Sequence, residues 1–424
     1  MPPLLLGAAG GGDVVRFFAV LGLMLVAGKF SAELAERLRQ PAVLGELVAG
    51  IVLGSSVLGV IPTGPDDPLR PVIAFLAEIG VVVLLFEIGL ETDLKAMARV
   101  GAPATAVALV GVAVPFLLGF LYWLSPLHAP EPAAGDAPTV AIFVGATLTA
   151  TSVGITGRVL SDLRCMDSTE ARLILGAAVI DDVLGLVILG VVSGLAAGAA
   201  VSVLGVVRTL AVAVGFLVAA VALGAALAPR IFGFVNRMRV RGVLLVSAFA
   251  FLLLLAALAA RAGSALIIGA FAAGIILSGT NQFEIIEKGM KPVADIFTPL
   301  FFLSIGAAVN VRAWNPLNPE NHGTLAVGGA LFVIAVFGKL VSGWAVPWRR
   351  FNRWAVGIGM APRGEVGLIF AQIGLTAGIL SGRLFSAILL MVIGTTLVAP
   401  PLLKWALGRW GSTGATTDPE ALVV

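Results

Sequence analysis

The chain has 424 residues, of which 59% are hydrophobic and only 12% are charged. A soluble domain carries about 25% charged residues, so this chain has roughly half of the charge that covers a globule in water. Apolar runs of roughly 18 residues or more recur from end to end, as in proteins with several membrane-spanning helices. This composition excludes a soluble enzyme, a nucleic-acid-binding protein and a disordered scaffold. The single cysteine, Cys165, excludes an internal disulfide and a metal site built from several cysteines.

Charged and proline-rich segments separate thirteen apolar ranges, each of which is predicted to form a membrane-spanning helix. In chain order the ranges are 14–36, 41–61, 70–92, 101–125, 139–160, 170–197, 204–230, 242–261, 263–279, 293–310, 324–347, 355–380 and 384–408. The predicted fold class is an all-α polytopic membrane protein with about 13 transmembrane helices. It forms a single transmembrane unit over 1–424 and ends in a short tail at 410–424.

The lysines and arginines between these ranges are unevenly distributed. Eighteen fall on one set of alternate loops and six on the opposite set. Because basic residues are retained on the cytoplasmic side, this asymmetry predicts an outside N-terminus and a cytoplasmic C-terminus, which needs an odd number of crossings. Arginine outnumbers lysine by 21 to 6, which favours a prokaryotic source. We therefore expect a multi-pass protein of a prokaryotic inner (plasma) membrane.

The first six ranges and the last six ranges share one feature. In each set, the fifth range is interrupted by residues that disfavour a helix. The interruptions lie near Thr151 and Pro362. With the range 204–230 as a linker, the second set would enter the membrane from the side opposite to the first. This arrangement predicts an inverted-topology repeat, which is common in secondary transporters.

Two adjacent aspartates, Asp181 and Asp182, lie inside the apolar range 170–197. A carboxylate at the centre of a membrane helix costs about 2.5–3.5 kcal/mol on insertion scales. Two neighbouring carboxylates in a low-dielectric interior repel one another, so at least one of them binds a proton readily. A group that binds either a proton or a cation is the core of an exchanger, and we interpret the pair in that way. The alternative is a pair of buried acids that only helps to pack the bundle.

Lys339 is the one basic residue deep within the range 324–347. An ammonium group in the bilayer must pair with a carboxylate or lose its proton. We therefore expect Lys339 to pair with the double aspartate. The alternative is a lysine whose side chain extends to the nearer membrane interface.

The interrupted fifth helix contains five hydroxyl residues among small ones: Thr147, Thr149, Thr151, Ser152 and Thr156. Hydroxyl oxygens are suitable ligands for a hard cation, so this segment is a candidate lining of an ion site. The alternative is that these hydroxyls bond to the backbone of their own helix.

The interrupted twelfth helix brings charge to membrane depth, with Arg363 and Glu365 beside Pro362. Unwound backbone is tolerated there only where it is buried in protein or lines a cavity. Two crossed half-helices would present helix ends of both signs near the midplane and stabilise an ion between them. The alternative is that Arg363 and Glu365 pair with each other as structural ions.

Other acids are weaker candidates: Glu46, Glu78 and Glu87 lie in the second and third ranges and could gate an entrance or hold a dimer interface. No metal-ligand spacing occurs, because His128 and His322 lie alone in external loops. The sequence has no phosphate-binding loop, no arrangement for a serine nucleophile and no nucleotide-binding domain. We therefore expect neither an enzyme nor an ATP-driven pump, and no cofactor.

Taken in order, these motifs resemble the cation:proton antiporter-2 family, in its NapA/GerN-like sodium/proton branch. The segments that carry the resemblance are PAVLGELVAGIVLG, IGVVVLLFEIGLETDL, ATSVGI, AAVIDDVLGLVIL, FTPLFFLSIG, FGKL and MAPRGEVGLI, between residues 41 and 370. The resemblance implies a homodimer in membrane lipid with an NhaA-like antiporter fold and two crossed broken helices. It implies that 14–92 and 242–310 form a dimerisation domain and that 101–197 and 324–408 form a mobile ion-transporting core, with 204–230 as the linker.

The same resemblance implies roles for single residues. Asp182 would bind the sodium ion or a proton, and Asp181 would form an ion pair with Lys339 that breaks when sodium enters. Thr151 and Ser152 would supply nearby oxygen ligands.

For the second interrupted helix the resemblance implies a lining in which Glu365 tunes the site beside Arg363. The double aspartate implies electrogenic exchange of two protons for one sodium, and the core would slide against the dimerisation domain in an elevator movement. Lithium is an expected second cation.

Competing interpretations remain open at this point. A potassium/proton or mixed sodium–potassium exchanger would fit the same residues. A sodium-coupled symporter of organic anions would share the crossed helices but would not need a lysine paired with two acids. A passive channel would differ in its flux rate and in having no obligatory proton movement. A membrane sensor would tolerate loss of the Asp182 carboxylate.

Overall fold

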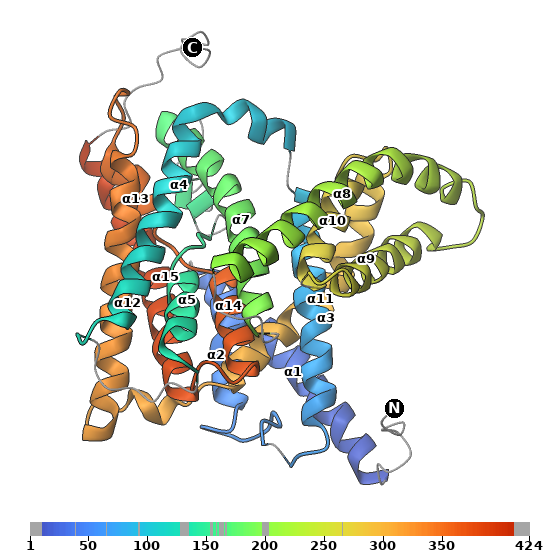
Figure 1. Ribbon diagram of the computed structural model, residues 1–424. Coiled ribbons are helices and arrows are strands. Elements are labelled where there is room, and N and C mark those ends of the chain that lie inside the picture. The colour runs from blue at the N-terminus through green and yellow to red at the C-terminus, as the bar shows by residue number, and fades with distance from the viewer. Residues whose placement is uncertain are drawn as a thin grey trace. The chain divides into compact units, whose positions relative to one another are not determined.

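The structure is a computed structural model that describes residues 11–38, 40–64, 66–91, 94–127, 135–152, 156–157, 159–160, 165, 168–196, 203–264 and 266–410. All regular structure in these residues is helical, and they contain no strand (Figure 1). The prediction of an all-α protein is confirmed for this part of the chain.

Nine helices in the described residues are long and apolar enough to cross a membrane, and four shorter apolar helices accompany them. The nine are α1 (Gly11–Arg37), α3 (Arg70–Glu91), α4 (Leu94–Leu124), α7 (Thr169–Ala196), α8 (Val203–Val235), α9 (Val243–Arg261), α11 (Phe283–Ala307), α12 (His322–Leu340) and α15 (Gly382–Trp410). The four are α2 (Ala42–Leu53), α5 (Ala137–Thr147), α10 (Leu266–Ser278) and α14 (Glu365–Thr376). The protein is therefore a multi-pass membrane protein, while thirteen crossings and the inverted repeat stay predictions.

Several predicted boundaries are wrong by several residues: α4 begins at Leu94 and not at 101, and α12 ends at Leu340 and not at 347. Two further differences have a clear physical reason. The second range, 41–61, is helical only to Leu53, where the extended backbone of Gly54 (ψ 174°) ends α2. The tenth range, predicted to begin at 293, begins at Phe283. Its first turns are rich in charge, and an ion pair between Lys291 Nζ and Glu287 Oε1 (2.8 Å) lies along the helix. A charged segment that resembles a loop in the sequence can therefore be helical, where oppositely charged residues four positions apart form ion pairs.

The two interrupted helices end where their sequences disfavour helix. In the fifth range, α5 ends at Thr147 and residues 148–152 are not helical. In the twelfth range, the short helix α13 (Arg353–Gly359) is separated from α14 by the non-helical residues 360–364. Pro362 lies within this second break and cannot donate a helical hydrogen bond.

The chain forms two compact units, named unit 1 and unit 2. Unit 1 comprises the chain to Glu91, Ala219–Leu258 and Gly269–Arg312. Unit 2 comprises Thr92–Val218, Ala259–Ile268 and the chain from Ala313 onward. Helix α8 is divided between them, so the predicted linker helix belongs to both units. The roles predicted for these parts, dimerisation and transport, stay predictions.

Unit 1 is built around α11, which packs against α2 and α3, while α1 packs against α2. Backbones approach closely because glycines face the neighbouring helix. A methyl group on Gly50 of α2 would overlap the carbonyl oxygen of Leu303 on α11, and one on Gly306 would overlap that of Leu47. Small residues at such crossings are the usual basis of helix packing in membranes.

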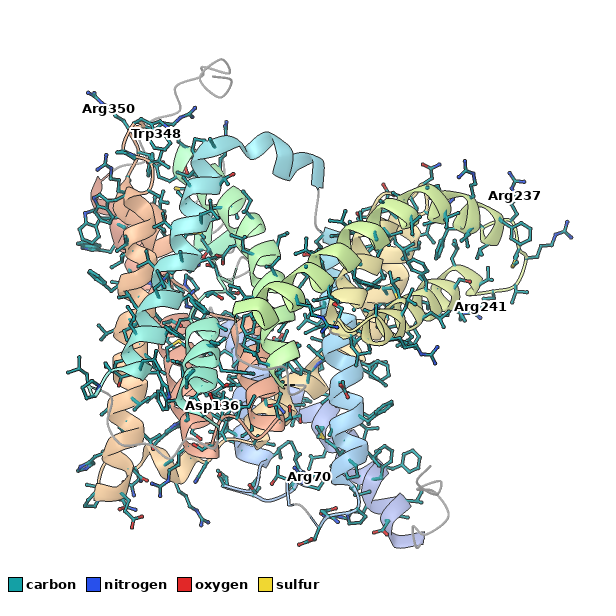
Figure 2. All side chains as sticks on the ribbon, viewed as in Figure 1. Arg70, Asp136, Arg237, Arg241, Trp348 and Arg350 are labelled. Atoms are coloured by element: carbon teal, nitrogen blue, oxygen red, sulfur yellow. The ribbon has the colours of Figure 1, made fainter. Side chains whose placement is uncertain are left out.

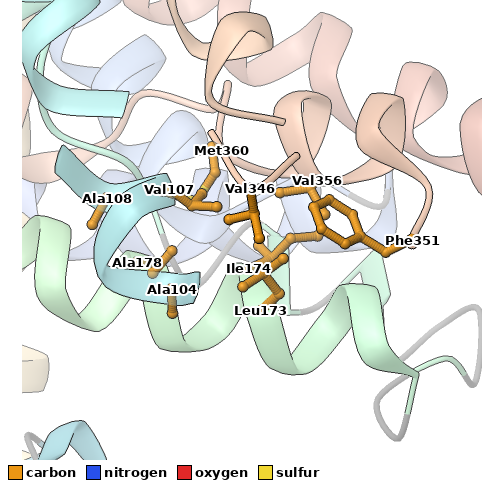
Figure 3. Close-up of a cluster of buried hydrophobic side chains, with 11 residues drawn as sticks. Ala104, Val107, Ala108, Leu173, Ile174, Ala178, Val346, Phe351, Val356 and Met360 are labelled. Atoms are coloured by element: carbon orange, nitrogen blue, oxygen red, sulfur yellow. The ribbon is translucent and has the colours of Figure 1, made fainter. Parts of the chain in front are cut away.

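Unit 2 contains the two breaks. Helix α4 packs against α5, α7 and α12, α15 runs alongside α12, and α14 contacts α5, α7 and α15 (Figure 1). One apolar cluster joins α4 and α7 to the segment that follows α12, and Figure 3 shows Val346 and Phe351 of that segment beside Leu173 and Ile174 of α7. This packing holds both ends of the segment that leads to the second break.

We expect Gly50→Val to destabilise unit 1, because its side chain has no space against Leu303. Overpacking of this kind costs about 1–3 kcal/mol. Thermal unfolding of the purified protein in detergent should show a lower midpoint. Gly22→Ala on α1 is the control, since nothing lies within 4 Å of its added methyl group, and its midpoint should not fall. Equal midpoints for the two variants would contradict the packing described for α2 and α11.

Candidate functional site

A buried ion pair lies at the centre of unit 2. Lys339 Nζ lies 2.8 Å from Asp181 Oδ1, and both side chains have no exposed surface. Asp181 comes from the middle of α7, and Lys339 comes from the last turn of α12. The lysine side chain is therefore in contact with the aspartate and does not extend to the membrane interface.

The second carboxylate oxygen of Asp181 accepts a hydrogen bond from the first break, residues 148–152. The backbone N–H of Thr151 donates to Asp181 Oδ2 over 2.7 Å. This N–H takes no part in helical bonding because α5 ends at Thr147 and residues 148–152 are not helical. The break thus supplies a donor that stabilises the charged form of the aspartate.

The two breaks bond to one another through their backbones and hydroxyls. The N–H of Ser152 donates to the carbonyl of Pro362 (2.9 Å), and the Thr151 hydroxyl donates to that of Met360 (3.1 Å). The Thr156 hydroxyl donates to the carbonyl of Gly359 (2.6 Å). Unwound backbone at this depth is thus paired within the protein, as membrane burial requires.

The other two hydroxyl residues of this segment behave differently. Thr147 and Thr149 donate to Val144 and Ala146, three residues earlier in the chain. For these two the alternative interpretation holds, since their hydroxyls bond to their own segment. The hydroxyls of Thr151 and Thr156, in contrast, bond to carbonyls of the second interrupted helix.

Arg363, in the second break, is fully buried and caps the first break with its guanidinium group. It donates to the carbonyls of Thr149 (3.1 Å) and Ala150 (2.8 Å), just beyond the C-terminal end of α5, and to that of Ala335 (3.2 Å) in α12. A cation at a helix C-terminus offsets the partial negative charge of its free carbonyls. The described bonds of Arg363 all go to backbone carbonyls, so it acts as a cap of α5.

Two predicted site residues lie partly outside the described residues. Asp182 follows Asp181 in α7, and Glu365 begins α14, but neither side chain is described. The backbone of Asp182 lies in α7, beside Asp181, and that of Glu365 lies at the start of α14, just after the second break.

The weaker acidic candidates belong to the other unit. Glu46 is buried on α2, Glu87 is half-buried on α3 and Glu78 is exposed on α3, all in unit 1, whereas Asp181 is in unit 2. Of the two histidines, His128 lies outside the described residues. His322 lies 3.0 Å from the carbonyl of Pro316 through its ring nitrogen Nε2.

Sequence reasoning missed two polar contacts that support the second break. Thr396 on α15 donates its hydroxyl to the carbonyl of Arg363 (2.7 Å). Glu170 at the start of α7 accepts from the N–H of Asn352 (2.8 Å), the residue that caps α13. The signals were weak, because a threonine in an apolar run and an acid in a first helical turn are both common.

The site places a buried carboxylate and its ammonium partner beside backbone oxygens and hydroxyls of the two interrupted helices. A hard monovalent cation prefers such oxygen ligands. Among the described side chains there is no group of three or more His, Cys, Asp or Glu residues that could hold a resident metal ion. A buried carboxylate in such surroundings is chemically suited to exchange of a proton or a cation.

This fold and site define a polytopic membrane protein with charge buried at interrupted helices, an arrangement typical of secondary transporters. Residues 20–409 match the family described as sodium/hydrogen exchanger, transmembrane. The chain belongs to this family, which agrees with the resemblance carried by its motifs.

Two relatives cover nearly the whole chain. The high-affinity Na+/H+ antiporter NhaS3 of Synechocystis sp. is 39% identical, over 91% of this chain and 89% of that protein. The Na+/H+-K+ antiporter GerN of Bacillus cereus is 35% identical, over 93% of this chain and 97% of that protein. Among solved structures, the sodium proton antiporter MjNhaP1 of Methanocaldococcus jannaschii has a TM-score of 0.66 at 18% identity. That alignment covers 93% of this chain and 97% of MjNhaP1, and it supports the fold alone.

We expect Lys339→Ala to destabilise unit 2 strongly, because it leaves a buried carboxylate without its cation. Breaking one side of a buried pair costs about 3–5 kcal/mol. Thermal unfolding in detergent should show the loss, and Asp181→Asn in the same chain should restore part of it. Lys29→Ala is the matched control: Lys29 pairs with Asp295 on an exposed surface of unit 1, where such pairs contribute about 1 kcal/mol or less. Equal losses from the two lysines would contradict the burial described.

We expect Arg363→Met to destabilise the protein as well, because three buried carbonyls lose their donor. Each unsatisfied buried group costs about 1–3 kcal/mol. Arg383→Met serves as the control in the same unit, since Arg383 makes long, exposed contacts with Glu320, 3.9 Å to its carboxylate and 3.4 Å to its carbonyl oxygen. Unfolding midpoints check the comparison, and an unchanged midpoint for Arg363→Met would show that Arg363 does not cap the first break.

Proposed function

We propose that the chain is a secondary active sodium (or lithium)/proton antiporter. The observation that carries the proposal is the buried pair of Asp181 and Lys339 next to Asp182, between two interrupted helices. A structural bundle has no need for two successive carboxylates and an ammonium group in its interior, because burying such charges is costly. Membership of the exchanger family and the names of the two relatives support the same function.

In the proposed mechanism, Asp182 binds either the cation or a proton. Asp181 is held by Lys339 and by the N–H of Thr151 when no cation is bound. An incoming sodium ion competes with the ammonium group for the carboxylate, and the ion pair breaks. Thr151 and Ser152 supply oxygens from the first break, while Glu365 and Arg363 tune the charge of the second.

Competition at one site makes the exchange obligatory. Moving a core whose carboxylates carry neither cation nor proton through a low-dielectric region would be costly. When sodium binds, Asp182 and Lys339 each release one proton. This gives the proposed stoichiometry of two protons per sodium. Exchange of that kind moves net charge and is electrogenic.

We assign the two units of the chain to the two parts of an elevator. Unit 2 contains the ion pair and both breaks, so it is the proposed mobile core. Unit 1, with its close helix crossings at Gly50 and Gly306, is the proposed dimerisation domain of a homodimer. The proposed location is a bacterial plasma membrane with the N-terminus outside, which the distribution of basic residues supports.

A second candidate is a mixed sodium–potassium/proton exchanger. The relative GerN is described as an Na+/H+-K+ antiporter, and it resembles this chain over nearly its full length. The oxygen ligands proposed for sodium are also suitable for potassium.

The decisive experiment measures charge movement by proteoliposomes after jumps of sodium, lithium and potassium, each with a set proton gradient. We expect a current with sodium and lithium that reverses with the proton gradient, and no current from Asp182→Asn. Asp67→Asn is the matched control, because Asp67 pairs with Arg16 in an exposed loop of unit 1, and it should transport as the native protein does.

Each other outcome has a definite meaning. A potassium current equal to the sodium current would replace the first candidate with the second. Proton flux without current would mean electroneutral exchange and would refute the role given to Asp181 and Lys339. Full activity of Asp182→Asn would refute the antiporter mechanism itself.

A further inference from the structure

The segment 345–352 is a tight loop that joins the last helical turn after α12, Val341–Trp344, to α13. Two of its apolar side chains are buried in the cluster shown in Figure 3. Val346 is fully buried and Phe351 is 9% exposed, and both pack with Leu173 and Ile174 of α7. The loop is therefore held at both ends, and its conformation is set by packing.

Asn352 ties the same loop to three helices. Its N–H donates to Glu170 of α7, its side-chain amide donates to the carbonyl of Ala406 on α15 (3.1 Å), and its side-chain oxygen accepts from the N–H of Ala355 on α13 (3.1 Å). The loop is thus preorganised, and it lies beside the last turns of α15.

The tip of the loop points away from the protein. Trp348 is 64% exposed, and Arg350 is exposed beside it; Figure 2 shows both projecting beyond the ribbon. Arg349 is half-buried, and neither Arg349 nor Arg350 has an ion pair or a side-chain hydrogen bond with the described residues. Arg353, which follows, makes only a long bond of 3.4 Å to the carbonyl of Pro347.

More tryptophans and a further cation surround this tip. Trp344 and Trp354 form an edge-to-face pair with ring centroids 5.0 Å apart, and both are exposed. Lys404 and Trp405 are exposed on the turn of α15 that Asn352 contacts. Glu170, the acid that bonds to the loop, is fully buried, so its charge does not lie on this surface.

We propose that this surface, the Trp348 patch, is a binding site for the phosphate headgroup of an anionic phospholipid. The patch consists of exposed tryptophans and cations: Trp344, Trp348, Arg349, Arg350, Arg353, Trp354, Lys404 and Trp405. It lies at the end of the membrane-spanning helices α12 and α15. Tryptophan is favoured at the level of lipid headgroups, and arginine binds phosphate through two parallel hydrogen bonds.

The combination of residues favours a lipid over free phosphate. Inorganic phosphate would be bound by the arginines but would give the exposed indole rings no apolar partner. A phospholipid supplies both a phosphate and acyl chains, and unpaired basic residues at a membrane surface attract anionic lipids. Because Arg349 and Arg350 have no acidic partner among the residues that the structure describes, binding there breaks no described ion pair.

A bound headgroup would act on elements that carry the ion site. The Ser342 hydroxyl, just before the loop, donates to the carbonyl of Lys339 (2.6 Å), and α13 after the loop leads into the break at residues 360–364. Lipid bound at the Trp348 patch would therefore stabilise the segment between the ammonium group and the second break. This consequence rests on the proposed function, whereas binding itself does not.

The test measures binding without transport. The full-length protein is purified in detergent, and its thermal unfolding midpoint is recorded with phosphatidylglycerol, with phosphatidylcholine and with inorganic phosphate; retained lipid is counted by native mass spectrometry. We expect phosphatidylglycerol alone to raise the midpoint and to be retained. The double variant Arg349→Gln/Arg350→Gln should lose at least half of both effects.

The matched control removes two arginines from another exposed loop. Arg237 and Arg239 lie in the loop between α8 and α9, are exposed, and are not surrounded by tryptophans in the sequence (Figure 2 labels Arg237 there). Arg237→Gln/Arg239→Gln should keep most of the phosphatidylglycerol effect. If both double variants lost the phosphatidylglycerol effect to the same extent, the effect would come from general charge attraction, and the proposal would be overturned.

Two further outcomes are also decisive. Trp348→Ala should weaken retention of phosphatidylglycerol with the arginines intact, and full retention would show that the indole rings take no part. An equal shift of the midpoint with inorganic phosphate would mean that the patch binds free phosphate and not a lipid.

Discussion

The ion pair between Asp181 and Lys339 joins two charges that would each be costly to leave alone in a membrane interior. Its stability depends on a third partner, because the N–H of Thr151 bonds the remaining carboxylate oxygen. The Thr151 N–H can bond Asp181 because it lies beyond the end of α5 and outside the helical hydrogen-bond pattern. The interruption of the helix thus supplies the second partner of the carboxylate. Both oxygens of this carboxylate thus have a hydrogen-bond partner within the protein.

The backbone carbonyls that the two breaks leave without helical partners are bonded in the same way, chiefly by donors from the opposite break. Where water is absent, freed carbonyls need donors from the protein. Arg363 supplies donors to the end of α5, Thr151 and Ser152 supply them to the second break, and Thr396 supplies one to Arg363 itself. Each break is thus stabilised chiefly by the other, which places the ends of two half-helices beside a buried carboxylate.

The division into two units has a simple chemical basis. Unit 1 is held by glycines that let α2 and α11 approach at backbone distance, and such packing is close and largely apolar. Unit 2 contains the buried charges and the polar breaks. Close packing at the glycine crossings holds unit 1 together, whereas in unit 2 satisfied polar contacts hold the two breaks together. This contrast is what an exchanger with a fixed and a mobile part would require.

The sequence by itself determined the all-helical membrane class, the two interruptions and the candidate charges, because charge and proline in long apolar runs are rare and costly. It did not determine the end of α2 at Leu53, which the extended backbone of Gly54 sets, or the start of α11 at Phe283, where paired charges resemble those of a loop. Only the tertiary structure decided that Thr147 and Thr149 bond their own segment while Thr151 and Thr156 bond the other break. Which partner a hydroxyl or a guanidinium takes depends on elements some 200 residues apart meeting in space, and no local pattern encodes that meeting.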